Sequence, residues 1–284
     1  MPELPEVETI VRGLRKEVLV KKIIDVWNDS PLHFLRHKNG LQDFKKQVIG
    51  SKIKNVTRLG KNIIFELSNN KNILLHLKMT GRLLLLDSNL KEKGDKLFKS
   101  KDPYIHTIFY LSGGKSLFFS DVRKFGKVLA HTKDDFYEIQ DLKNLGRDAL
   151  KITFEEFQKS IGNKKIAIKN VLLNQEVIAG IGNIYADEIL FLSRINPLRP
   201  ANKISIKELK NIYSAIFKIL NKAIKLRGSS MSDYQDIQGK LGNYFKVRLV
   251  YGRKGEKCPR CKTEISQVML RGRSMHFCEK CQNK

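Results

Sequence analysis

Two pairs of cysteines close the chain, as Cys258-Pro259-Arg260-Cys261 and Cys278-Glu279-Lys280-Cys281, with 16 residues between them. Each C-x-x-C pair directs two thiolates toward one point, and four thiolates form a closed, tetrahedral zinc site. Two disulfides would instead require an oxidising compartment, and the acidic, proline-containing N-terminus does not resemble an export signal. The spacing therefore predicts one structural Zn²⁺, bound by Cys258, Cys261, Cys278 and Cys281.

Between the two pairs the sequence predicts a small basic hairpin. Residues 264–270 and 274–278 have the composition of two short strands, which Arg271-Gly272-Arg273 would join, so that Arg273 lies at the tip. Residues 251–284 contain nine Lys and Arg against three Glu. An arginine at a hairpin tip is commonly only solvated, but on a basic module held by a metal we expect it to contact phosphate.

The whole chain carries the same charge bias. Its 284 residues include 54 Lys and Arg against 29 Asp and Glu, which gives a net charge of +25. Such an excess indicates a polyanionic partner, either nucleic acid or an anionic membrane surface. No apolar run approaches the 18 residues of a membrane span. We therefore expect a nucleic-acid partner, no membrane association, and a location in the bacterial cytoplasm or nucleoid.

Hydrophobic periodicity divides the rest of the chain into two regions. Residues 5–18 repeat apolar side chains at helical spacing, and Pro5 suits a first helical turn. Short apolar segments with the composition of strands follow, at 62–67, 73–79, 82–86, 107–111 and 116–119. Beyond residue 134 the period becomes helical, with helices expected at 153–161, 164–173, 183–194 and 205–226. The predicted fold class is α+β, with an N-terminal β-sandwich and leading helix, then a helical domain that ends in the zinc finger.

Turn residues and capping signals set the expected domain boundaries. They are a β-sandwich domain at 1–133, a linker at 134–152, a helical domain at 153–230, a glycine-containing loop at 231–246 and the finger at 247–284. Thr153 and Ser205 are each followed three residues later by glutamate, the capping-box pattern that opens a helix. The charged segment 88–102 is expected to be a surface loop, and the sequence assigns it no role.

Proline at position 2 is a candidate nucleophile. Methionine is ordinarily removed before proline, which leaves a secondary amine whose pKa lies below that of lysine. This amine would lie near the start of the helix at Pro5, where the dipole disfavours the cation. Glu3 beside it is a candidate for moving protons. A partly neutral amine can attack an electrophilic carbon.

Four segments, taken together with the finger, resemble the formamidopyrimidine-DNA glycosylases, bacterial enzymes that repair 8-oxoguanine. They are Pro2-Glu3-Leu4-Pro5-Glu6-Val7-Glu8, His76-Leu77-Lys78-Met79-Thr80-Gly81, Asp121-Val122-Arg123-Lys124-Phe125-Gly126 and Gly180-Ile181-Gly182-Asn183-Ile184-Tyr185-Ala186-Asp187-Glu188. The resemblance spans the whole chain in the family's order. It departs at Val122, where the family commonly has proline, and in residues 144–150, which keep part of the family's linker motif.

The resemblance implies a catalytic set. Pro2 would be the nucleophile that attacks C1′ of the damaged nucleotide and forms an iminium, and Glu3 would be the acid/base that opens the sugar ring. Glu6, as a second buried acid near the sugar, would belong with His76 among the DNA-binding residues. Lys61 would contact the phosphate beside the site, and Arg273 would grip the phosphates that flank the lesion.

The resemblance also implies a set of DNA-probing residues. The segment that begins at His76 would carry Met79 into the base stack, Arg123 would face the orphaned cytosine, and Phe125 would wedge between base pairs. An extruded base leaves a space that such side chains fill. From hydrophobicity alone, Met79 and Phe125 would be assigned to the core.

The helical region would complete the DNA contacts. Residues 153–230 would form the family's helix–two-turns–helix domain, in which Asn183 contacts phosphate at a helix start. Lys169 in the preceding helix matches a family lysine and would also contact DNA. Residues 231–246 would close over the flipped base.

The implied function is that of a monomeric, bifunctional enzyme. It would remove 8-oxoguanine and formamidopyrimidines from double-stranded DNA and cleave abasic sites by β,δ-elimination through the Pro2 iminium, with the zinc ion as its one cofactor. An endonuclease VIII-type glycosylase for oxidised pyrimidines remains an alternative, although that family typically has glycine where this chain has Leu4. A non-catalytic zinc-finger DNA-binding protein is a second alternative, against which the intact Pro2 and Glu3 argue.

Overall fold

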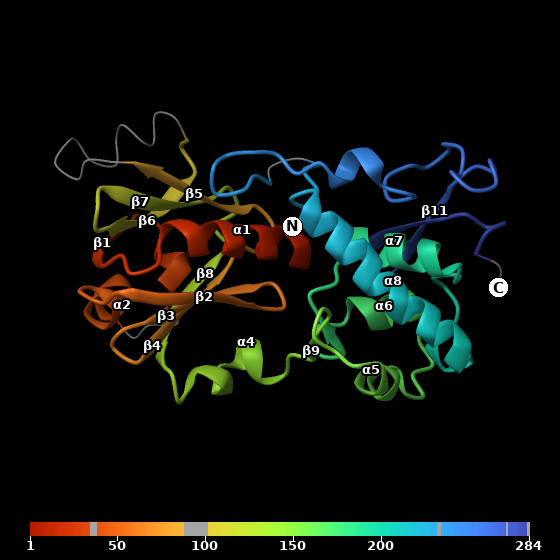
Figure 1. Cartoon of the computed structure of the whole chain (residues 1–284), viewed down its shortest axis with the longest axis horizontal. Helices are drawn as coiled ribbons and strands as arrows, with labels where there is room; N and C mark the ends of the chain where they lie inside the picture. Colours follow the sequence, from red (N-terminus) through yellow and green to blue (C-terminus); the bar gives the residue numbers. More distant parts are fainter. Residues whose placement is uncertain (35–38, 88–101, 232–233, 271, 283–284) are drawn as a thin grey trace. The chain divides into compact units, whose positions relative to one another are not determined.

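The computed structural model describes residues 1–34, 39–87, 102–231, 234–270 and 272–282. The chain divides into two compact units (Figure 1). Unit 1 comprises Met1–Lys143 and Arg227–Gly242, and unit 2 comprises Asn144–Leu226 and Asn243–Lys284. The loop expected at 88–102 lies outside the described residues, apart from Asp102. Within the described ranges, no helix combines the length and the apolar character that crossing a membrane requires.

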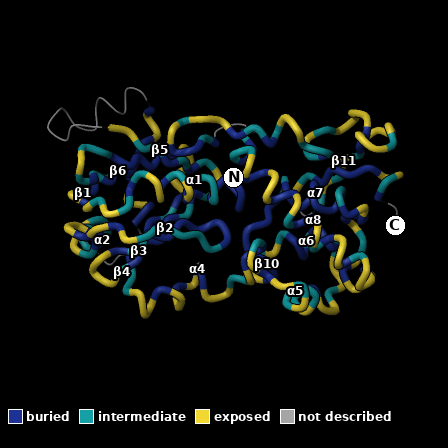
Figure 2. The backbone as a smooth tube through the Cα atoms, in the orientation of Figure 1, coloured by how far each residue is buried: buried dark blue, intermediate teal, exposed yellow. Residues whose placement is uncertain are grey.

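Unit 1 consists of two antiparallel four-stranded sheets and a leading helix, α1 (Leu4–Glu17). The sheet orders are β1-β6-β7-β5 and β2-β3-β4-β8. The strands are β1 (Ile23–Asn28), β2 (Ile53–Leu59), β3 (Asn62–Leu67), β4 (Lys71–His76), β5 (Gly81–Asp87), β6 (Ile105–Leu111), β7 (Lys115–Asp121) and β8 (Lys127–Thr132). The apolar face of α1 joins one core with side chains of both sheets. Buried residues are dark blue in Figure 2. The predicted β-sandwich with one leading helix is thereby confirmed.

Short elements complete unit 1, and none of them was predicted. They are η1 (Pro31–Phe34), α2 (Leu41–Val48), η2 (Phe136–Glu138) and α4 (Gln140–Lys143). In β1 and β2, which were also not predicted, the pairing register shifts once near the start of the strand. Each shift breaks the strict alternation of inward and outward residues, so the period-2 signal is lost.

Unit 2 is helical and ends in a hairpin. Its helices are α5 (Phe154–Ile161), α6 (Ile168–Leu173), α7 (Asn183–Ser193) and α8 (Ile206–Lys225). Both predicted capping boxes are present, since the hydroxyls of Thr153 and Ser205 accept from the N–H groups of Glu156 and Glu208. The remaining elements are β9 (Arg147–Asp148), β10 (Ile178–Ala179), η3 (Ala201–Lys203), η4 (Tyr244–Val247), β11 (Ser266–Leu270) and β12 (Arg273–Phe277).

Helix α7 lies at the centre of unit 2, with eight of its eleven residues buried. One of them, Glu188, accepts hydrogen bonds from the N–H groups of Leu249, Val250 and Tyr251 at 2.7 to 3.0 Å and from the hydroxyl of Tyr244 at 3.0 Å. Burial raises the pKa of the Glu188 carboxyl group despite these four donors. This side chain fixes the start of the finger segment to α7.

Candidate functional site

Pro2 and Glu3 lie directly before the first turn of α1, and both are buried. Glu3 is the N-cap residue, and its N–H donates to Oε2 of Glu6 at 2.8 Å. The other carboxylate oxygen of Glu6 accepts from the N–H of Ser229 at 2.7 Å. Two N–H groups therefore orient the Glu6 carboxylate, and the positive end of the helix dipole lies beside Pro2 and Glu3. This arrangement suits a nucleophile paired with a group that moves protons.

The described residues of the segment 227–242 include several that pack against the same helix. The backbone of Gly228 has a φ of +80°, and a Cβ at this position would lie 2.6 Å from Oε1 of Glu6, so the approach requires glycine. The buried Tyr234 donates its hydroxyl to the backbone carbonyl of Glu6 at 3.3 Å, and burial raises the pKa of this phenol. Tyr234 and Ile237 join the core of unit 1. Neither residue was among the predicted site residues, and the only signal in the sequence is an aromatic and an aliphatic side chain within a polar segment.

Lys61 lies in the two-residue turn between β2 and β3, and only 7% of its surface is exposed. A lysine buried this far differs from an ordinary solvated lysine at a strand edge. Its strand β2 is joined to α1, because Arg58 donates to Glu8 of that helix at 3.0 Å. Burial acts to raise the pKa of Glu8, but its two arginine partners lower this pKa by more than burial raises it, so the carboxylate is charged. Lys61 thus lies in a turn that directly follows a strand fixed to the leading helix.

The loops after β4 and β7 present apolar and cationic side chains outward. Met79 is 46% exposed and Phe125 is 53% exposed, so neither belongs to the core. The guanidinium of Arg123 lies over the ring of Phe125, 4.6 Å from its centroid. His76, the last residue of β4, accepts the N–H of Lys78 at its Nδ1 at 2.9 Å and so shapes the first loop. The loops are neighbours in unit 1, because β5 pairs with β7.

In unit 2, Asn183 is the first residue of α7, and Gly182 is the N-cap. The amide nitrogen of Asn183 donates to the backbone carbonyl of Ser274 in β12 at 3.0 Å. Its Oδ1 is buried without a hydrogen-bond partner among the described residues. The start of α7 is therefore attached directly to the finger hairpin.

Lys169 of α6 is 1% exposed. Its ammonium lies 2.6 Å from Oδ1 of Asp187 and donates to the carbonyl of Ser274 at 2.8 Å. The other oxygen of Asp187 accepts the N–H of His276 at 2.9 Å. These bonds hold β12, whose first residue is the exposed Arg273. The geometry favours a role for Lys169 in positioning this hairpin over the direct DNA contact that the resemblance implies.

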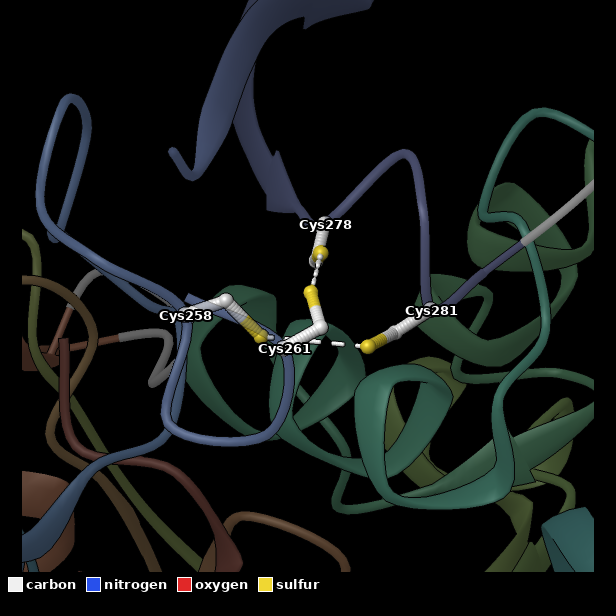
Figure 3. A group of neighbouring side chains, drawn as sticks. All are labelled: Cys258, Cys261, Cys278 and Cys281. Atoms are coloured by element: carbon white, nitrogen blue, oxygen red, sulfur yellow. Dashed lines mark hydrogen bonds between the residues drawn. The ribbon is translucent and has the colours of Figure 1, made fainter. Parts of the chain in front are cut away.

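Four sulfur atoms converge at the base of the finger (Figure 3). The Sγ atoms of Cys258 and Cys281 lie 3.9 Å apart, those of Cys261 and Cys278 lie 3.4 Å apart, and all four lie within 4.8 Å of one another. Four sulfurs bound at about 2.3 Å to a tetrahedral ion would lie about 3.8 Å apart. The cysteines therefore form a metal site, as their spacing predicts.

The predicted site residues fall into two groups, one in each unit. Unit 1 holds Pro2, Glu3, Glu6, Lys61, His76, Met79, Arg123 and Phe125. Unit 2 holds Lys169, Asn183, Arg273 and the four cysteines.

Comparison with known proteins gives one consistent result. Sequence models of the Formamidopyrimidine-DNA glycosylase N-terminal domain, the Formamidopyrimidine-DNA glycosylase H2TH domain and the Zinc finger found in FPG and IleRS match residues 1–128, 145–235 and 255–284. A Mycoplasmopsis pulmonis protein named Formamidopyrimidine-DNA glycosylase is 36% identical over 286 residues, which cover 100% of this chain and 99% of that protein. Two solved complexes of Lactococcus lactis Fpg are 34% identical and cover 100% of both chains. One is a mutant bound to DNA containing Fapy-dG (TM-score 0.88), and the other is the wild type bound to DNA containing an oxidized pyrimidine (TM-score 0.87).

Proposed function

Because the chain belongs to the formamidopyrimidine-DNA glycosylase family, we propose that it removes oxidised purines from double-stranded DNA and then cleaves the abasic strand. The observation that carries this proposal is the start of α1, where Pro2 and Glu3 are buried just before the helix and two N–H groups orient the carboxylate of Glu6. The net charge of +25 favours binding to the phosphate backbone of any DNA sequence. We also propose that the enzyme acts as a monomer on the chromosome, in the cytoplasm of a bacterial cell.

The proposed chemistry begins at the nitrogen of Pro2. This nitrogen is a tertiary amide while Met1 is attached, so Met1 must first be removed. The lone pair of the freed amine then attacks C1′, and the bond from C1′ to the damaged base breaks with its electron pair leaving on the base, which takes up a proton. Glu3 protonates the ring oxygen as the bond from C1′ to that oxygen breaks, and the amine proton is lost as the iminium forms.

The iminium makes strand cleavage possible. It withdraws electrons, so a proton can leave C2′ while the 3′ phosphate departs, and a second elimination then releases the 5′ phosphate. Water hydrolyses the final iminium and restores Pro2. The expected product is a gap of one nucleotide with a phosphate at each end.

The remaining residues supply DNA binding. We assign Met79 and Phe125 to the space and the stack around the extruded base, and Arg123 to the orphaned base, because all three are presented outward by neighbouring loops. Lys61 and Arg273 are assigned to phosphates at the lesion, and Asn183 to phosphate at the start of α7.

Zinc is the metal that we propose for the four-cysteine site. Four thiolates leave no open coordination position, so the ion would stabilise the finger and take no part in the chemistry. Its effect on DNA binding would be exerted through the hairpin that carries Arg273.

Borohydride trapping tests the proposed chemistry. The protein, after mass spectrometry has shown that Met1 is absent, is incubated with a duplex that carries 8-oxoguanine opposite cytosine. A covalent adduct in the wild type that is lost in Pro2→Gly is the expected result, with DNA binding retained. The matched control is Pro5→Gly, which alters the same turn without touching the proposed nucleophile. Absence of an adduct in the wild type would refute the proposal.

A parallel duplex that carries an oxidised pyrimidine separates the two substrate classes. This second candidate merits a test because one solved relative was crystallised with DNA of that kind. Faster trapping on 8-oxoguanine supports the purine enzyme. Trapping on the pyrimidine duplex alone would assign the chain to endonuclease VIII-type chemistry instead.

The wedge residues have their own test. Replacing both Met79 and Phe125 with alanine should slow base removal from a duplex by more than tenfold, while elimination at a preformed abasic site changes by less than about threefold. The reason is that an abasic site has no base to extrude and costs less to open. Equal losses on both substrates would contradict the wedge assignment.

A further inference from the structure

One buried carboxylate lies between the two loops that carry the exposed side chains. Asp121 is the last residue of β7 and pairs with Gly81, the first residue of β5. Its side chain is fully buried. Oδ1 accepts the hydroxyl of Thr80 at 2.5 Å and the N–H of Arg123 at 3.3 Å, and Oδ2 accepts the N–H of Gly126 at 2.7 Å. One charged group therefore bonds to both loops.

A second contact joins the loops directly. The N–H of Arg123, in the second loop, donates to the hydroxyl oxygen of Thr80, in the first, at 3.1 Å. Thr80 thus donates to Asp121 and accepts from Arg123 with the same oxygen. A Thr80 side chain without its hydroxyl would leave the carboxylate with one donor fewer and the Arg123 N–H with one acceptor fewer.

Both loops also rest on one aromatic ring. A Cβ on Gly81 would lie 2.8 Å from the ring of Phe119, and a Cβ on Gly126 would lie 2.3 Å from it. The backbone of each loop therefore packs on Phe119 without room for a side chain. Behind that ring, His33 stacks at 4.8 Å between centroids and places its Nε2 3.7 Å from Oδ2 of Asp121.

These neighbours stabilise the ionised form of the buried Asp121 carboxyl group. Burial alone would raise its pKa, but His33, the Thr80 hydroxyl and the Gly126 N–H lower it by more. The carboxylate is therefore ionised at neutral pH, and hydrogen bonds to an ionised acceptor are stronger than neutral ones. Each loop also contains a lysine with positive φ, Lys78 at +54° and Lys124 at +56°, a conformation that needs support from its surroundings.

We propose that Asp121 is a positioning residue that joins segments 76–81 and 121–126 into a single DNA-probing element, so that Met79 and the Arg123–Phe125 pair enter DNA together. The proposal rests on the proposed function in one respect, namely that these loops meet DNA. The coupling of the loops is a property of the free protein and does not depend on activity.

Hydrogen exchange of the free protein tests the coupling. Thr80→Val should accelerate amide exchange about tenfold in both segments, including the second loop, where no residue has been changed; Asp121→Asn should do the same. Thr80→Ser restores the hydroxyl and should exchange like the wild type. Asp135→Asn is the matched control, because Asp135 also accepts a threonine hydroxyl, that of Thr132 at 2.7 Å, but lies on an exposed turn.

Two outcomes of the exchange experiment would overturn the proposal. In the first, Thr80→Val changes exchange in the first loop alone, which would make the loops independent. In the second, neither segment responds to Thr80→Val or to Asp121→Asn. If Asp121→Asn fails to fold, Thr80→Val decides, since it retains the buried carboxylate and the volume of the side chain.

A kinetic comparison adds a readout that general destabilisation would not move. In Thr80→Val, removal of 8-oxoguanine from a duplex should fall about tenfold, while elimination at a preformed abasic site stays within about threefold. Adding Met79→Ala should cost less in the Thr80→Val background than in the wild type, because a displaced loop already inserts poorly. Fully additive losses would overturn the proposal. If the wild type acts on neither substrate, the proposed function fails, and the exchange result still decides the coupling.

Discussion

Replacing Lys169 with methionine should destabilise unit 2 strongly. The Lys169 ammonium lies 2.6 Å from Asp187, and both side chains are no more than 2% exposed. At an effective dielectric constant of 20, this separation corresponds to about 6 kcal/mol of attraction, from which the cost of removing both charges from water must be subtracted. Breaking such a buried pair by removing one partner typically costs roughly 3–5 kcal/mol, because the other charge is left uncompensated. Lys169→Met should lower the free energy of unfolding of unit 2 by this amount.

A double variant separates the pair from its surroundings. In Lys169→Met combined with Asp187→Asn, no uncompensated charge is buried, so the double variant should be more stable than the sum of the two single losses predicts. The matched control is Arg147→Met. Arg147 also pairs with a carboxylate in unit 2, that of Glu156 at 2.9 Å, but its side chain is 71% exposed. Its loss should change stability by less than about 1 kcal/mol.

The chain offers one spectroscopic probe for each unit. Its single tryptophan, Trp27, lies in β1, so fluorescence follows unit 1. Circular dichroism at 222 nm is dominated by helices, and the longest helix, α8, belongs to unit 2. In guanidinium titrations of Lys169→Met, the dichroism transition should move to lower denaturant while the fluorescence transition stays in place.

One result would refute this reasoning. If Lys169→Met unfolds like Arg147→Met but loses affinity for duplex DNA in fluorescence anisotropy, then Lys169 acts as a DNA contact and not through the hairpin. Loss of affinity together with loss of stability supports the positioning role.

Three further predictions follow from other parts of the structure. Gly228→Ala should reduce strand cleavage at least tenfold, because its Cβ would lie 2.6 Å from the Glu6 carboxylate. Gly239→Ala is the control and should retain most activity, because Gly239 has a similar φ but its nearest contact would lie at 4.0 Å. A gel assay of strand cleavage on a lesion duplex compares the two variants, and equal losses would contradict this prediction. Cys258→Ser should abolish the binding of one zinc per chain in a chromogenic chelator assay and weaken DNA binding. Glu208→Gln should destabilise unit 2 by about 1 kcal/mol at pH 7, because an arginine lowers the Glu208 pKa to about 2. A carboxyl group whose pKa is lowered by folding stabilises the folded state at pH values above its unfolded-state pKa. The difference in unfolding free energy between the wild type and Glu208→Gln should therefore fade as the pH falls from about 4.5 to about 2.

The features that could be predicted from the sequence are those encoded within a few residues. Helix α1 follows from apolar spacing, the two capping boxes follow from residues three apart, and the metal site follows from two C-x-x-C pairs. Strand β3, whose bounds match the predicted 62–67, contains the apolar run Ile63-Ile64-Phe65. Each of these signals is local, so tertiary packing does not have to be known.

The features that could not be predicted depend on partners far apart in the chain. The Glu6 carboxylate meets Ser229 across 223 residues, and Asp121 and Glu188 are held largely by backbone N–H groups, which every sequence contains. From hydrophobicity alone, Met79 and Phe125 would be assigned to the core, and only the family resemblance predicts that they contact DNA. The burial of Lys169 likewise depends on distant partners, Asp187 and Ser274, which its own sequence neighbourhood does not reveal.

The division of the chain between the units has a consequence for biosynthesis. Unit 1 takes its last residues, 227–242, from beyond most of unit 2. On the ribosome, residues 1–143 emerge first and must wait for Tyr234 and Ile237 before their core is complete. During that interval the apolar surface of α1 that these two side chains later cover is exposed to solvent. The Glu6 carboxylate, too, lacks the Ser229 N–H until then, so the surroundings of the first turn of α1 are completed late in synthesis, after the helices of unit 2 have been made.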